Sequence, residues 1–152
     1  MSKNRNLMLA RYGGFYEFQD FGDRMKCCYC GDIREAIDHI PALSVVDGVG
    51  MKEIRKRKIK LITVPSCWSC NSRLHDKPLA TYSERLVYLY NDLQNKLDKS
   101  VLWSKEDLDE LGGNLKKMVV AKQLQIRREL LLRLRGMEER MASVYINDEE
   151  LK

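Results

Sequence analysis

Two C-x-x-C pairs constrain the fold of this chain more than any other feature of its sequence. Cys27 and Cys30 form the first pair, and Cys67 and Cys70 form the second. Four thiolates satisfy the tetrahedral preference of zinc and leave no open coordination position, so this spacing predicts a closed, structural zinc site. Such a site holds together a small region that could not bury enough surface alone. Cys28 is left over, and buried free cysteines or redox disulfides are the alternatives to zinc.

The composition of the 152 residues is that of a folded protein in a reducing setting. Apolar residues make up 44% and charged residues 32%, so we expect a packed core. The formal net charge of +5 permits a polyanionic partner. Apolar runs are too short to span a membrane, and LMLA at residues 7–10 is too short for a secretory signal. We therefore expect a cytoplasmic protein without a membrane partner, in which regularly spaced cysteines bind metal.

The front half of the chain has the pattern of a small α+β unit. Residues 12–21 hold five aromatic side chains and are predicted to form an apolar flap that packs on a small core. Residues 36–40 and the β-branched residues 59–65 are predicted strands. Residues 44–50 contain two glycines and are predicted to form a loop. A short helix is expected after Cys70, and Pro78 ends it.

The back half is predicted to be helical. Thr81 and Glu84 form a capping-box pattern at the start of a helix of about 18 residues. Ser104 and Asp107 offer a second cap before a short helix, which Gly112-Gly113 breaks. A long helical pattern then runs over residues 114–145. Its predicted apolar face includes Leu115, Met118, Val119, Ile126, Leu130, Leu134, Met137 and Met141.

The two histidines of the chain both stand beside potential metal ligands. His39 follows Asp38 in the first predicted strand, and His75 lies four residues after Asn71, on one face of the predicted helix. The zinc clamp would bring this helix close to the strand. Asp38, Asn71 and His75 could then hold one divalent ion, such as magnesium or manganese. His39 would be free to act as a general base, since an imidazole with a pKa near 6.5 is largely neutral at pH 7.

The order of these motifs resembles the zinc-clamped branch of the HNH (ββα-metal) nucleases. The matching segments are Cys27–Gly31, Asp38–Pro41 and Cys67–Asn71, and the resemblance covers about residues 25–78. It implies an α+β fold with a small ββα-metal core, a four-cysteine zinc site and a helical C-terminal region. It also implies that Asp38, Asn71 and His75 bind the catalytic ion and that His39 activates water. The expected activity is hydrolysis of DNA to 5′-phosphate and 3′-hydroxyl ends.

One position departs from this family. An asparagine often lies about five residues before the third zinc cysteine, where it orients the base or braces the loop. Ile62 stands at that position in this chain. A backbone carbonyl could hold His39 instead. The departure bears on the bracing of His39 more than on the fold.

A basic cluster lies between the predicted loop and the second strand, beside the expected site. Contacts of such residues with phosphates supply affinity without reading sequence. Arg73, on the short helix, could also clamp a phosphate through its planar guanidinium, or simply face solvent. The predicted DNA-binding residues are Lys52, Arg55, Lys56, Arg57, Lys58, Lys60 and Arg73.

The pattern divides the chain into a nuclease core at residues 1–78 and a helical region at residues 79–152. The helical region is expected to contact DNA, a second copy of the chain or another protein. A single HNH centre cuts one strand, so either a nicking monomer or a dimer fits the sequence. The alternative function is a catalytically inactive, zinc-containing module that binds DNA or protein. By analogy with the family, a phage or mobile element is an expected source, which would place the protein in the host-cell cytoplasm.

Overall fold

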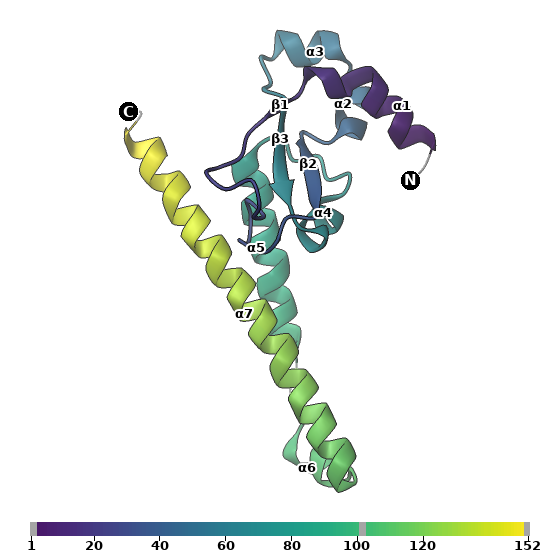
Figure 1. The fold of residues 1–152 in the computed structure, drawn as a ribbon, viewed down its shortest axis with the longest axis vertical. Coiled ribbons are helices and arrows are strands. Elements are labelled where there is room, and N and C mark those ends of the chain that lie inside the picture. Colours follow the sequence, from purple (N-terminus) through teal and green to yellow (C-terminus); the bar gives the residue numbers. More distant parts are fainter. Residues whose placement is uncertain (1–2, 101–102, 151–152) are drawn as a thin grey trace.

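A small mixed sheet lies at the centre of the front half. The computed structural model describes residues 3–100 and 103–150, and the fold is α+β (Figure 1). Within these residues the strands are β1 (Glu17–Phe18), β2 (Ala36–Ile40) and β3 (Ile62–Ser66), in the order β1-β3-β2. β2 pairs with β3 in antiparallel fashion and β1 with β3 in parallel. The strand predicted at residues 36–40 is confirmed, and the second predicted strand begins three residues later than expected.

Short helices replace the predicted loop. α1 (Lys3–Tyr12) and a 3-10 turn (Gly13–Phe15) precede β1, while α2 (Leu43–Val49) and α3 (Met51–Lys56) connect β2 to β3. The prediction of a loop at residues 44–50 is therefore wrong. Leu43 and Val46 are one helical turn apart and both are buried, so packing outweighs the local preference of the glycines. Gly50, at a φ of 83°, ends α2 and allows the chain to turn into α3.

The aromatic segment at residues 12–21 packs only in part. Tyr12 is buried against α2, and Tyr16 is half-buried. Phe15, Phe18 and Phe21 are exposed, although Phe21 stacks on Tyr82 with the ring centroids 4.4 Å apart, so the predicted apolar flap packs on the core only in part. Their rings leave an aromatic surface beside the sheet.

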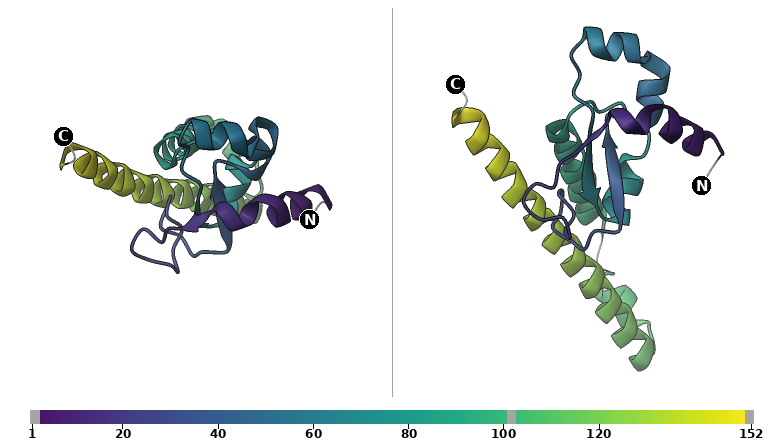
Figure 2. Two further views of the ribbon diagram at one scale, coloured as in Figure 1. Left: turned by 90° about the horizontal axis from the view of Figure 1, so that it is seen from above. Right: turned by 45° about the horizontal axis from the view of Figure 1, so that its top comes forward.

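The predicted helices of the back half are confirmed. They are α5 (Tyr82–Lys99), α6 (Lys105–Asp109) and α7 (Gly113–Glu150), after the short α4 (Trp68–Leu74). Thr81 and Glu84 form the predicted capping box of α5, and Ser104 caps α6. α7 is the long helix that crosses the molecule in Figures 1 and 2. No helix of the described residues is both long and apolar enough to cross a membrane.

The main core joins both halves of the chain. One face of the sheet, the cysteines, α5 and the second half of α7 contribute buried side chains to one cluster, whereas α1–α3 enclose a smaller cluster. Leu134 and Met137 are buried as the predicted apolar face of α7 requires. Leu115, Met118 and Ile126 are exposed, so that prediction is wrong for the first half of the helix. The reason is that α7 extends past the sheet and the cysteines there (Figure 1).

Candidate functional site

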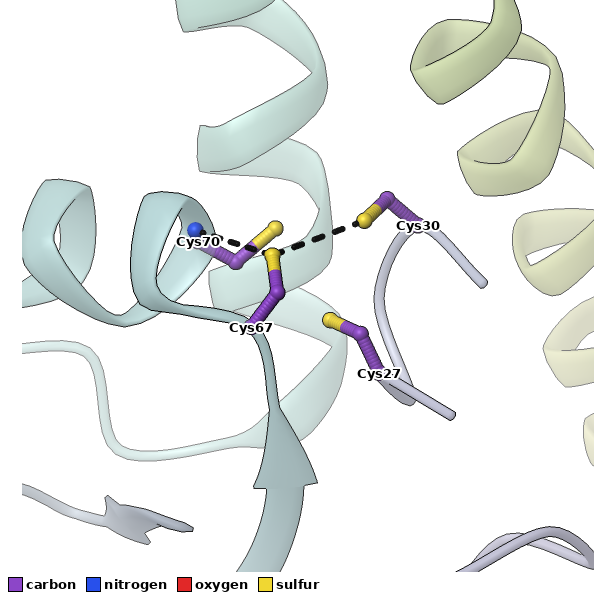
Figure 3. A group of neighbouring side chains, drawn as sticks. All are labelled: Cys27, Cys30, Cys67 and Cys70. Carbon is purple, nitrogen blue, oxygen red and sulfur yellow. Dashed lines mark hydrogen bonds between the residues drawn. The ribbon is translucent and has the colours of Figure 1, made fainter. Parts of the chain in front are cut away.

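The four predicted zinc cysteines converge at the edge of the main core (Figure 3). Cys27 and Cys30 lie on the turn before β2, Cys67 is the N-cap of α4, and Cys70 lies in its first turn. All four are buried, and their sulfur atoms lie within 4.8 Å of one another. This is the metal-binding geometry that the C-x-x-C spacing predicts. Cys28 is buried as well, but it is not part of the cluster.

The distances in the cluster fit zinc. A tetrahedral ion with Zn–S bonds of about 2.3 Å holds its sulfurs about 3.8 Å apart. The Cys30 and Cys67 sulfurs are 3.8 Å apart. Hydrogen bonds from the neighbouring thiols, that of Cys27 first among them, lower the pKa of Cys67. The Cys70 amide also donates to the Cys67 sulfur at 3.4 Å. The cluster can therefore hold a metal such as zinc, bound by thiolates in a closed site.

α7 packs directly on the cysteine cluster through two residues that the sequence analysis did not single out. The Arg133 guanidinium donates to the Cys70 sulfur at 3.2 Å and lies 3.6 Å from that of Cys67. Gly136 faces the Cys30 carbonyl so closely that a Cβ atom there would lie 2.1 Å from its oxygen. A positive charge beside a four-thiolate site offsets part of its negative charge. A glycine inside a long helical pattern was the available signal for this close approach.

A cavity of about 630 Å³ lies between α1, α2, α4 and the free edge of β2. Asp38, His39, Asn71 and His75 all line it, so the cysteine clamp brings the strand and the segment after Cys70 together as predicted. Ser44 and Asp76 line it too, and the Ser44 hydroxyl donates to the Asp76 carboxylate at 2.9 Å. The cavity combines imidazole, amide and carboxylate groups. Among the described residues, however, no three His, Asp or Glu side chains gather there as closely as the cysteines do.

Asp38 forms a buried ion pair that the sequence analysis missed. Arg85 of α5 donates to both of its carboxylate oxygens, at 2.9 and 2.8 Å, and the Tyr29 hydroxyl donates at 2.6 Å. Burial raises the pKa of Asp38, against the opposing effects of Arg85 and Tyr29. The prediction that Asp38 binds a divalent ion therefore applies to a carboxylate that Arg85 and Tyr29 already engage. Arg85 and Tyr29 together occupy three of its roughly four acceptor positions.

His39 is half-buried and lines the cavity. Burial, with smaller contributions from Arg5 and Arg85, lowers its pKa to about 4. The edge of its ring meets Tyr16, with the ring centroids 4.9 Å apart, and its backbone pairs with Thr63. The Tyr16 hydroxyl is anchored on the Pro41 carbonyl at 2.7 Å. Tyr16 thus braces the imidazole by packing, which is a contact that the sequence analysis did not foresee.

His75 does not share a helical face with Asn71 as predicted. α4 ends at Leu74, and His75 is its C-cap with a φ of 32°, its amide donating to the Asn71 carbonyl at 3.0 Å. The His75 side chain is exposed, and its Nδ1 lies 2.8 Å from the Asp76 carboxylate. α4 ends one residue before His75, because Asp76, Lys77 and Pro78 cannot extend the face of the helix that packs on the core. His75 therefore lines the cavity from a turn.

The predicted DNA-binding residues separate into two groups. The six basic residues from Lys52 to Lys60 are all exposed on α3 and the turn after it. Arg73 instead pairs with Asp92 of α5 and is largely buried, so its predicted role as a phosphate clamp in the cavity is not supported.

Comparisons with protein-family models, with curated proteins and with solved structures found no match to this chain.

Proposed function

We propose that the protein is a metal-dependent endonuclease of the HNH type that hydrolyses DNA. The observation that carries this proposal is the cavity that His39, Asn71 and His75 all line. The order of two antiparallel strands followed by a helix agrees with the motif resemblance, with one cysteine pair before the first strand and the other at the start of the helix. The substrate would be a phosphodiester, and the products would carry 5′-phosphate and 3′-hydroxyl ends.

His39 would take the proton from a water molecule that attacks the phosphorus in line. Its lowered pKa keeps the imidazole neutral at pH 7, and it also makes His39 a weaker base than an ordinary histidine, whose pKa lies closer to 7. The oxygen of Asn71, the imidazole of His75 and the carboxylate of Asp76 have the donor chemistry of a magnesium or manganese site. Such an ion, when bound, stabilises negative charge on the phosphate and the leaving oxygen.

His39→Ala is expected to lower the cleavage rate by at least about 100-fold, the lower range for loss of a general base. The measurement is conversion of supercoiled plasmid to open-circle or linear DNA with magnesium or manganese, beside an EDTA control. Gln125→Ala, exposed on α7, is the matched control and should cut normally. Circular dichroism should show that His39→Ala remains folded. Cleavage at the wild-type rate by His39→Ala would remove His39 from the mechanism.

The exposed basic cluster of α3 would supply non-specific affinity for DNA. Replacing Lys52, Lys58 and Lys60 with glutamine is expected to weaken duplex binding and to lower the slope of log K against log salt by about 2–3, or about 0.9 per lost phosphate contact. Lys96, Lys99 and Lys105, exposed on α5 and α6, form a control triple with the same change of charge. Fluorescence anisotropy over a salt series measures both slopes. A slope for the Lys52, Lys58 and Lys60 triple equal to that of the wild type would remove α3 from the DNA interface.

The Asp38–Arg85 pair favours a second candidate, a zinc-containing module that binds DNA or protein without cutting it. A carboxylate that is already neutralised by a buried arginine is a weaker ligand for a catalytic ion. DNA binding with no plasmid conversion in either metal would support this candidate. For an active enzyme, the ratio of nicked to linear product, together with the mass in solution, would separate a nicking monomer from a dimer.

A further inference from the structure

One face of the sheet carries both the candidate base and an exposed aromatic ring. Phe18, Thr63 and His39 are in register across the three strands, so their side chains project from the same face. The opposite face carries Asp38, Ile40, Ile62 and Val64, which are buried toward the main core. Phe18 is 41% exposed, although it extends the row of side chains that begins at His39.

Two arginines lie over the Phe18 ring. The guanidinium carbon of Arg24 is 5.7 Å and that of Arg34 5.8 Å from the ring centroid. Arg34 also donates to the Arg24 carbonyl at 3.3 Å, and Asp20 accepts from Arg24 Nε at 3.2 Å, so both side chains are held over the ring. The result is a partly exposed aromatic ring in cation–π contact with two cations. A nucleotide has the matching chemistry, because its base can stack on an aromatic ring and its phosphate can pair with an arginine.

The same arrangement recurs toward the basic cluster. Arg55 of α3 lies 5.6 Å from the Phe15 ring centroid, and Phe15 is 49% exposed. Phe15, Arg55 and Lys60 line a shallow cavity of about 280 Å³. A second exposed ring in contact with an arginine thus lies next to the basic cluster that the proposed function assigns to DNA.

We propose that this surface binds an unpaired DNA strand, with a base stacked on Phe18 and phosphates held by Arg24 and Arg34. The inference rests on the proposed function, and it names single-stranded DNA as the substrate class. A phenyl ring has no groups that read base edges, so it recognises the flat face of a base, which neighbouring bases cover in a duplex. Two strand spacings separate Phe18 from His39, about 10 Å, which two or three stacked nucleotides span. A strand stacked on Phe18 would thus reach the candidate base.

The test measures binding of labelled oligothymidine to the full-length protein by fluorescence anisotropy, without added divalent ion. Phe18→Ala is expected to weaken binding about 5- to 150-fold, the range for loss of one stacked base. Phe18→Trp should retain wild-type affinity. Trp103→Ala, an exposed aromatic residue near α6, is the matched control and should leave binding unchanged.

The other possible results test the binding of unpaired DNA separately from the nuclease activity. Equal affinity of Phe18→Ala and wild type, equal affinity for a duplex of the same length, or tighter binding of oligouridine would overturn the assignment of unpaired DNA. Plasmid cleavage without oligothymidine binding would overturn this inference and leave the nuclease intact. Oligothymidine binding that depends on Phe18, without cleavage in any metal, would support the inference and overturn the nuclease.

Discussion

Asp38→Ala is expected to lower the free energy of unfolding by about 3–5 kcal/mol, because it leaves the Arg85 guanidinium buried without its counter-charge. Arg85 is fully buried, and the carboxylate of Asp38 is the acidic partner that its Nη1 contacts. Urea unfolding followed by circular dichroism measures the change. Glu17→Ala, an exposed acid on β1, is the matched control and should change stability by less than about 0.5 kcal/mol.

A double variant separates the two roles of Asp38. Asp38→Leu combined with Arg85→Met removes both charges and should restore most of the stability, because a buried pair is often replaced by apolar residues at little cost. If Asp38 acts only as a ligand of a catalytic ion, Asp38→Ala would abolish cleavage while the unfolding midpoint stays unchanged. That outcome would contradict the structural role of the ion pair.

Loss of one cysteine of the cluster is expected to destabilise the protein more than Asp38→Ala does. Cys67→Ala should abolish stable zinc binding and unfold the front half near room temperature, because binding energy in such sites is folding energy, about 10–16 kcal/mol for zinc-finger peptides. Cys67 also caps α4, which would lose its first-turn hydrogen bond. Zinc content by elemental analysis and thermal unfolding by circular dichroism measure the two effects.

Cys28→Ala is the control for that experiment. Cys28 is as deeply buried as Cys67 but stands outside the cluster, so this variant should keep its zinc and lose only about 1–2 kcal/mol from the smaller side chain. Purified wild-type protein without bound metal, or equal destabilisation of the two variants, would show that the thiols pack without an ion.

Local chemistry accounts for the parts of the fold that the sequence predicted. The capping box at Thr81 and Glu84 and the cap at Ser104 involve residues three apart, so their hydrogen bonds depend on neighbours in the chain. The loop predicted at residues 44–50 failed for the opposite reason. Two glycines favour a loop locally, but burial of Leu43 and Val46 against Tyr12, far away in the chain, favours the helix.

The alternation of side chains along a strand bears on the candidate site. Neighbouring strand residues point to opposite faces, so Asp38 and His39 could not both face the same way from the middle of β2. The sequence does not say which face becomes the core. The packing of α5 decides it, because Arg85, from a helix distant in the chain, draws the carboxylate of Asp38 inward.

The sequence by itself determined the cysteine cluster and the long helices, because metal geometry and helix capping act over short, regular spacings. Only the tertiary structure decided the partners of these elements. Arg133 and Gly136 meet the cysteines, Arg85 meets Asp38, and Phe18 joins the row of His39 through contacts between residues far apart in the chain. Such contacts depend on the relative placement of whole helices and strands, which no local pattern of residues specifies.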